Sequence, residues 1–339
     1  MEHKDGIILS CSSYELKKSE IEFFKIINPL GFVLFRRNFK NKLQIKTLIQ
    51  RLKEVTLNND LLIFVDQEGG RVQRFNNNEF VIFPSQSVFG KLYKSNKTLG
   101  LELAYKSSYL MGLQLNEVGV DVNFSPVCDL LFDDAHEVIG DRSFGKNPKL
   151  VYDLSNKFCK GFADSGIVAV PKHFPGHGRS MFDTHLNSSI VKTSYNELKK
   201  TDLVPFRILN NSTMVMLAHI VYLSLDSNVA TYSNVIIENI LRKQFKFEGL
   251  VISDDISMKA LNEDLPTKVK KCYRAGCDAI LYCKGDIKEI KSFYPYVQKV
   301  KDEPMSYFLE KKKKIIIQKK NINKFKSDLL EYGLINDSS

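Results

Sequence analysis

Residues 167–178 read Ile-Val-Ala-Val-Pro-Lys-His-Phe-Pro-Gly-His-Gly, an apolar run that ends in ionisable side chains and a glycine-rich loop. A continuous apolar run of this kind is typical of a strand buried on both faces, as in a parallel sheet covered by helices. The prolines and glycines around the two histidines exclude a helix at this point. We therefore expect a central strand whose carboxyl end opens into a shaped polar loop.

Seven other apolar runs share this pattern, and longer amphipathic stretches separate most of them. The runs cover residues 6–13, 31–38, 61–70, 120–130, 213–222, 249–258 and 277–283. Residues 98–119 and 233–245 are typical helical stretches, the second with Ser233 or Asn234 as its N-cap. Eight strand-helix units favour a closed barrel over an open doubly wound sheet, and no GxGxxG motif follows the first strand. The predicted fold class is α/β, a single (β/α)8 TIM-type barrel without a second α/β domain.

The rest of the chain adds little to that barrel. Its 339 residues are 43% hydrophobic and 26% charged, which describes a globular protein, and no Pro/Gly/Ser-rich linker divides them. We expect residues 1–302 to form the catalytic barrel. Residues 303–339 are expected to form a C-terminal helix and a short tail packed on the outside of the barrel.

Charge and cysteine content exclude several classes of protein. The net charge is +10, and much of the excess lies in residues 310–320, where no aromatic side chains are interleaved for base stacking. This predicts a solvated helix face, with a basic nucleic-acid groove as the less favoured alternative. No apolar stretch approaches the roughly 18 residues of a membrane span, and the N-terminus lacks the apolar core of a signal peptide. Six scattered cysteines without a CxxC pair indicate reduced thiols. We expect a cytoplasmic protein with no nucleic-acid or membrane partner.

Ionisable side chains stand at the carboxyl ends of five predicted strands, and in a barrel all of these ends meet on one face. They are Asp66 and Glu68, Asp129, Lys172 and His173, His219, and Asp254 with Asp255. Two segments of the chain suggest specific chemistry. Asp183 stands two residues before His185 and could accept a hydrogen bond from its ring N–H, an arrangement typical of proton-transfer sites. One of the paired acids Asp254 and Asp255 is a candidate nucleophile, because buried carboxylates are costly outside a polar site.

Five motifs together resemble the β-N-acetylglucosaminidases (β-hexosaminidases) of glycoside hydrolase family 3, NagZ type. They are DQEGGRVQR at 66–74, GDRSFG at 140–145, KHFPGHG at 172–178 followed by Asp-x-His, MLAHI at 216–220 and VISDDISM at 251–258. The resemblance spans about residues 6–285. It implies a cytoplasmic single-barrel enzyme that needs no cofactor or metal.

The resemblance also implies a role for individual residues and a reaction. Asp254 matches the nucleophile, and His185 the acid/base with Asp183 as its orienting partner. Five residues match the sugar-binding positions, namely Asp66, Arg74, Arg142, Lys172 and His173. The implied reaction is retaining, exo-acting hydrolysis of terminal β-1,4-linked N-acetylglucosamine from anhydro-muropeptides in peptidoglycan recycling, by a monomer. Phosphorolysis with the same nucleophile and acid/base is the alternative.

Several residues have a plainer interpretation. Asp255 is expected to cap a helix start near Ser257, and His177 to anchor its loop, since Pro175 and Gly176 disfavour a metal-binding HxxxH helix. His219 could line or support the site. Glu68 could be structural or could bind sugar through water, and Asp129 is expected to be an ordinary strand-end residue. The residues after Gly178, Arg-Ser-Met-Phe, are bulkier than the family pattern. A non-catalytic sugar-binding protein and a metal-dependent amidohydrolase are the rival classes.

Overall fold

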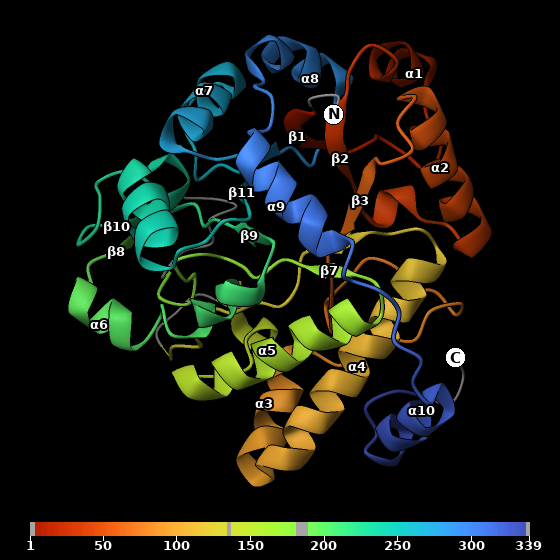
Figure 1. Ribbon diagram of the computed structural model, residues 1–339, viewed down its shortest axis with the longest axis vertical. Helices are drawn as coiled ribbons and strands as arrows, with labels where there is room; N and C mark the ends of the chain where they lie inside the picture. Colours follow the sequence, from red (N-terminus) through yellow and green to blue (C-terminus); the bar gives the residue numbers. More distant parts are fainter. Residues whose placement is uncertain (1–3, 134–136, 181–188, 337–339) are drawn as a thin grey trace.

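Eight parallel strands form one sheet in the computed structural model, which describes residues 4–133, 137–180 and 189–336 (Figure 1). The order of strands around the sheet is β7-β6-β3-β2-β1-β12-β11-β9, so that neighbours in the chain are neighbours in space. Each of the eight predicted runs overlaps one of these strands, although β1 begins one residue before its run and β2 two residues before. The bounds are β1 Asp5–Leu9, β2 Pro29–Leu34, β3 Leu62–Val65, β6 Val122–Asn123, β7 Val168–Ala169, β9 Met214–Met216, β11 Leu250–Asp255 and β12 Ala279–Leu281.

The sheet closes into a barrel through the residues that follow β7. Phe174 N donates to Met216 O at 2.8 Å, and Ala218 N donates to Phe174 O at 2.8 Å. On the other side of the same segment, Cys128 N donates to Lys172 O at 2.7 Å. The glycine-rich motif thus joins the two ends of the sheet, and the predicted (β/α)8 barrel is confirmed.

Most strands are apolar on both faces because each face meets a different apolar layer. In β3, Leu62 and Phe64 belong to the cluster that fills the barrel, whereas Ile63 and Val65 belong to the cluster between strands and helices. Successive side chains of a strand point to opposite faces, so both sets must be apolar. This double burial accounts for the lack of alternation in the strand sequences.

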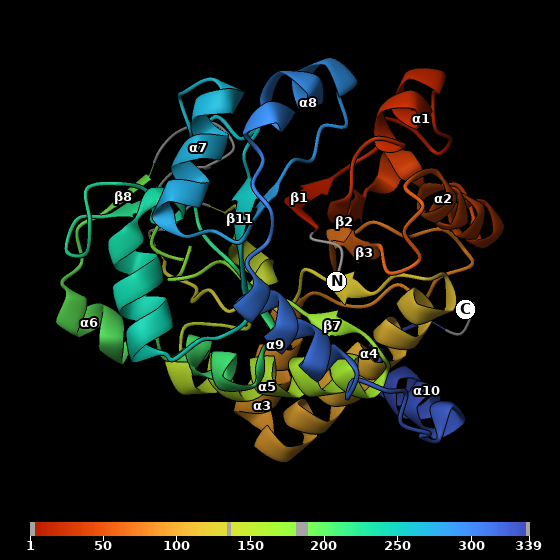
Figure 2. The ribbon, with the colours of Figure 1, turned by 45° about the horizontal axis from the view of Figure 1, so that its top comes forward.

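Helices surround the barrel (Figures 1 and 2). In α2, Ile45, Leu48, Ile49 and Leu52 recur at helical spacing on the buried face, and the Asn41 side chain caps the first turn. The helices are α1 Lys18–Phe24, α2 Lys42–Val55, α3 Gln86–Ser95, α4 Lys97–Glu117, α5 Pro148–Asp164, α6 Tyr195–Lys200, a π-type helix Val235–Gln244, α7 Leu265–Ala275 and α8 Ile287–Phe293. The strand pairs are β4 Gln67–Gly69 with β5 Val72–Gln73, and β8 Ser189–Val191 with β10 Ile220–Tyr222.

Both predicted helical stretches are helices in the structure, as α4 and Val235–Gln244. Of the two N-cap candidates for the second, Ser233 provides the side-chain cap. Its Oγ accepts a hydrogen bond from Ile236 N at 3.1 Å, whereas Asn234 makes no side-chain cap bond.

The segment after residue 302 forms two helices, α9 Asp302–Lys312 and α10 Ile322–Glu331, where one helix was expected. Helix α9 lies across the amino-terminal end of the barrel (Figure 1), with the fully buried Phe308 in the apolar cluster of the barrel interior. Helix α10 packs on α4 through Phe325. Adjacent like charges at 311–314 and three β-branched isoleucines at 315–317 disfavour a continuous helix. The division of the chain into domains at residue 302 stays a prediction.

No helix in the described ranges combines the length and the apolar composition that crossing a membrane requires. All six cysteines lie in these ranges, and each is a free thiol. Four of them are buried, namely Cys11, Cys128, Cys272 and Cys277. The prediction of reduced thiols in place of a disulfide framework is consistent with this arrangement.

Candidate active site

A cavity of about 350 Å³ opens at the carboxyl end of the barrel, where parallel strands place their terminal side chains. Six of the eight residues singled out from the sequence line this cavity. They are Asp66, Arg74, Arg142, Lys172, His173 and Asp254. The other two, Asp183 and His185, lie outside the residues that the structure describes.

Two carboxylates and three cations form a connected network in the wall of this cavity. Glu68 binds the Arg142 guanidinium with two oxygens, at 2.8 Å to Nε and 2.9 Å to Nη2. Lys172 Nζ lies 2.6 Å from Glu68 Oε1 and 2.7 Å from Asp66 Oδ1. Arg74 Nη2 completes the network at 3.3 Å from Asp66 Oδ2. Each buried charge therefore has a partner, which is the condition for keeping it inside a protein.

The cations keep both carboxylates ionised. Burial by itself would raise the pKa of Glu68, but the charges of Arg142 and Lys172 outweigh it and lower this pKa to about 2. Burial is likewise outweighed at Asp66, where Lys172 and Arg74 hold the pKa well below its usual range. An ionised carboxylate is an acceptor that suits the hydroxyl groups of a sugar. Of the two interpretations left open for Glu68, these contacts support the structural one: Glu68 aligns the Arg142 and Lys172 side chains.

Asp129 organises the glycine-rich loop, which corrects its interpretation as an ordinary strand-end residue. Its buried carboxylate accepts hydrogen bonds from His173 N at 3.1 Å and from His177 N at 2.6 Å. Its second oxygen lies 2.7 Å from His173 Nδ1. Because an ionised carboxylate only accepts, Nδ1 carries the proton. Burial would raise the pKa of Asp129, but the neighbouring His173 lowers it below the usual value. No sequence motif marks Asp129; its place at a strand end was the only signal.

The other two histidines near the site are buried and differ in position. His177 lines the cavity. His219 is not among the lining residues; its Nε2 donates to Asp255 O at 3.1 Å, and its Nδ1 lies 2.7 Å from Thr231 Oγ1. His219 therefore supports the end of β11 from outside the cavity lining. Burial lowers the pKa of His219 as well as that of His177, which favours the uncharged rings.

Within the described part of the chain, no group of three His, Cys, Asp or Glu side chains could hold a metal ion.

Acid should destabilise the protein through His177. Burial, and then the nearby His173, lower its pKa to about 4, whereas an unfolded histidine titrates near 6.5. Between these values the unfolded chain binds the proton and the folded chain does not, so the free energy of unfolding falls as the pH drops. The slope from one such group is at most about 1.4 kcal/mol per pH unit. Urea unfolding of the wild type and of His177→Asn from pH 7 to 4 should show a shallower slope in the variant. Equal slopes would contradict this assignment.

Of the two adjacent acids at the end of β11, Asp255 is committed to the backbone. Its carboxylate accepts from Ser257 N at 3.0 Å, from Ser257 Oγ at 2.6 Å and from Cys283 N at 3.1 Å. The expected cap near Ser257 exists, but it caps a turn, since the next helix, α7, begins only at Leu265. Both acids line the cavity, and Asp254 Oδ1 accepts from Asp255 N at 2.8 Å.

The bulky residues after Gly178 begin with an arginine that is tied to the wall of the barrel. Arg179 Nε donates to Asp202 Oδ2 at 2.8 Å, and Nη2 donates to Thr201 Oγ1 at 3.1 Å. Its guanidinium carbon lies 4.2 Å from the centre of the Phe132 ring. These contacts account for a basic side chain at this position without a role in the cavity. Met181 and Phe182 lie outside the described residues.

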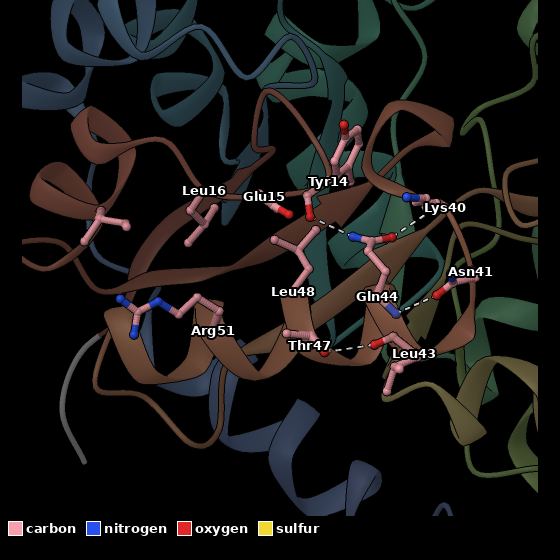
Figure 3. A pocket seen from close by; sticks show the side chains of 11 residues that line it. Tyr14, Glu15, Leu16, Lys40, Asn41, Leu43, Gln44, Thr47, Leu48 and Arg51 are labelled. Carbon is pink, nitrogen blue, oxygen red and sulfur yellow. Dashed lines mark hydrogen bonds between the residues drawn. The ribbon is translucent and has the colours of Figure 1, made fainter.

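A larger cavity, of about 520 Å³, lies beside α2 and is shown in Figure 3. Its walls come from residues 14–16 and from the first turns of α2, where Gln44 Nε2 donates to Tyr14 O at 2.7 Å. The strand-end ionisable groups listed above are absent from its lining. Chemistry in a barrel of this type takes place at the carboxyl ends of the strands, so the smaller cavity is the candidate active site.

The closed barrel and the charged cavity at its carboxyl end define a (β/α)8 enzyme with a carboxylate-bearing polar site. The chain belongs to glycosyl hydrolase family 3: the model of the family's N-terminal domain matches residues 12–317. Family membership makes it a glycosidase and confirms the resemblance seen in the motifs.

Individual relatives are similar over most of their length. The chain is 39% identical to a beta-hexosaminidase of Hydrogenovibrio crunogenus over 287 residues, 83% of this chain and 79% of that protein. It is 36% identical to a beta-hexosaminidase of Nitrosomonas eutropha over 271 residues, 78% and 77% of the two chains. The crystal structure of NagZ from Neisseria gonorrhoeae in complex with N-trifluoroacetyl-D-glucosamine superimposes with a TM-score of 0.84 at 29% identity. That superposition covers 98% of this chain and 95% of the other.

Proposed function

We propose that the protein is a retaining, exo-acting β-N-acetylglucosaminidase that removes terminal β-1,4-linked N-acetylglucosamine from anhydro-muropeptides during peptidoglycan recycling. The observation that carries the proposal is the position of Asp254, which lies in one cavity with the Asp66, Lys172 and Arg74 network. The names of the relatives support a hexosamine as the substrate. The N-trifluoroacetyl-D-glucosamine complex of the Neisseria protein supports it too.

The charged network would hold the terminal sugar. The ionised Asp66 carboxylate accepts hydrogen bonds from sugar hydroxyls, while Arg74, Arg142 and Lys172 donate to sugar oxygens. His173, whose Nδ1 is held by Asp129, presents its other ring nitrogen for the same purpose. A cavity of about 350 Å³ is at the small end of the range for ligand sites. Its size therefore suits one sugar ring, as an exo-acting enzyme requires.

Catalysis would proceed in two steps. Asp254 attacks the anomeric carbon while an acid protonates the leaving oxygen, and a covalent glycosyl-enzyme forms. Water then attacks this intermediate with the same residue acting as base, and the configuration is retained. The resemblance assigns the acid/base role to His185, oriented by Asp183. A histidine is protonated near neutral pH without the large upward pKa shift that a glutamate acid needs.

Replacing His185 by Ala should slow hydrolysis by an amount that depends on the leaving group of the substrate. Without a proton donor, a poor leaving group such as a sugar alcohol departs slowly, whereas 4-nitrophenolate leaves without help. We expect kcat/KM to fall at least about a hundredfold for the poor leaving group and about tenfold for the good one. A series of aryl N-acetyl-β-glucosaminides measures the dependence. Equal losses across the series would remove His185 from the acid/base role.

Product identification tests the reaction itself. Purified enzyme is incubated with anhydro-muropeptides in the presence and absence of phosphate, and the products are separated and identified by mass spectrometry. We expect free N-acetylglucosamine in both cases, in line with the hexosaminidase names of the relatives. N-acetylglucosamine 1-phosphate as the main product would establish phosphorolysis instead. No turnover at all would favour a sugar-binding protein.

We also infer that the enzyme works in the cytoplasm, as a monomer and without a cofactor. The six free thiols support a reducing compartment, where disulfides are rare.

A further inference from the structure

Residues 313–324, which we call the Lys-Ile strip, form an exposed segment that the proposed reaction does not use. Five lysines and three isoleucines of the strip are exposed, and the strip contains no acidic residue. The lysines are Lys313, Lys314, Lys319, Lys320 and Lys324. The isoleucines are Ile316, Ile317 and Ile322, exposed to 59%, 49% and 41%. Exposed isoleucines so close together are unusual on a protein surface that has no partner.

The strip is held against the amino-terminal end of the barrel. It starts at the end of α9, which closes that end, and it continues into α10 (Figures 1 and 2). Gln318 N donates to Asp164 O at 2.7 Å, and Tyr109 Oη donates to Gln318 O at 2.6 Å. These bonds place the strip beside the turn that leads into β7. The candidate active site opens at the opposite, carboxyl end of the same strands.

Nearby carboxylates already have partners and do not neutralise the strip. Asp121 pairs with Lys312 at 2.9 Å, and Asp164 pairs with Lys160 at 2.9 Å. Glu310 pairs with Lys314 at 2.6 Å. Among the residues of the structure, no carboxylate lies within ion-pair distance of the other four exposed lysines, Lys313, Lys319, Lys320 and Lys324. The surface therefore combines unneutralised positive charge with exposed apolar side chains.

We propose that the Lys-Ile strip binds the surface of an anionic phospholipid bilayer. Lysines attract the negative lipid headgroups, and isoleucines enter the boundary between headgroups and acyl chains, as in other peripheral membrane segments. A single-stranded nucleic acid would need aromatic side chains for base stacking. The strip contains none, and Phe325, the next residue along the chain, packs on Tyr105 and Tyr109. The strip lies on the membrane and does not span it. The proposal revises the expectation that the chain has no membrane partner.

This orientation has a consequence for the enzyme. Because the strip and the candidate active site lie at opposite ends of the barrel, a bilayer bound to the strip leaves the cavity open to the aqueous side. Substrate can then enter while the protein is attached.

Co-sedimentation with vesicles tests the proposal on the full-length protein. Vesicles contain phosphatidylcholine alone or with 30 mol% phosphatidylglycerol, at low and at physiological salt. We expect binding only to the anionic vesicles, weakened by salt. Each lysine near such a surface contributes about fivefold in affinity, so Lys319→Gln/Lys320→Gln should bind roughly 25-fold more weakly. The control Lys91→Gln/Lys94→Gln removes the same charge from exposed positions on α3, and it should bind within about twofold of the wild type.

A second double variant, Ile316→Ser/Ile317→Ser, separates lipid from other polyanions. It should bind anionic vesicles several-fold more weakly and bind a labelled single-stranded oligonucleotide as the wild type does. Thermal unfolding checks that each variant is folded, and sugar release should stay at the wild-type level, since none of these residues lies near the cavity. No binding to anionic vesicles at low salt would overturn the proposal. Equal losses in the two lysine variants, or unchanged vesicle binding by the isoleucine variant, would overturn it too.

Discussion

Asp254→Ala is expected to lower kcat/KM for release of 4-nitrophenol from its β-N-acetylglucosaminide by about 10⁴-fold or more. The physical reason is the loss of the covalent intermediate. Without the carboxylate at the cavity wall, no protein group attacks the anomeric carbon, and water must displace the aglycone directly. The substitution removes a partly exposed side chain at a strand end, so folding should be retained.

Two further measurements make this result specific to the nucleophile. Azide, a small anion, fits the space left by the carboxylate and should restore part of the release by forming the α-glycosyl azide, whose configuration is opposite to that of the substrate. Asp264→Asn serves as the matched control, because Asp264 caps α7 and lies away from the cavity. Activity that survives in Asp254→Ala would show that another group is the nucleophile.

Glu68→Gln is expected to lower the free energy of unfolding by about 3 to 5 kcal/mol, the usual cost of breaking a buried ion pair from one side. Glu68 is 1% exposed and binds both Arg142 and Lys172. The amide carries no charge, so both cations lose part of their compensation. The same loss should loosen Arg142 and Lys172 and raise KM more than it lowers kcat. Urea unfolding and steady-state kinetics measure the two effects.

An exposed ion pair provides the comparison for Glu68. Arg71 and Asp141 lie 2.9 Å apart with side chains about half exposed, and Asp141→Asn should cost less than about 1 kcal/mol. The pH dependence gives an independent check. Because the pKa of Glu68 is lowered to about 2, its contribution is complete above the ordinary glutamate pKa and is lost as the pH falls through 2. If Glu68→Gln were no less stable than Asp141→Asn, Glu68 would not hold Arg142 and Lys172 in place.

Strand positions followed from the sequence because burial on both faces leaves a continuous apolar run. The run at 61–70 contains β3, whose residues alternate between the barrel interior and the helix layer, and both layers are apolar. Position along the chain also located the site. Residues that end parallel strands must share one face, so the strand-end residues Asp66, Lys172, His173 and Asp254 line one cavity.

Contacts between distant segments could not be predicted from the sequence in the same way. Asp129 looks like any acid after a strand, yet it accepts three hydrogen bonds from the loop that contains His173 and His177. The position of α9 depends on Phe308, which lies in the apolar cluster of the barrel interior. Both features depend on the packing of segments that are more than forty residues apart.

The sequence by itself determined the strands, the family and the strand ends at which chemistry takes place, because local apolar pattern and motif spacing encode them. The tertiary structure decided which charges meet. Barrel closure at residues 172–174 brings Lys172 to Asp66 and Glu68. Asp254 and Asp255 both line the cavity, and the turn after β11 commits the Asp255 carboxylate to Ser257 and Cys283. The pKa of each group depends on its neighbours and its burial, and the folded chain alone provides these.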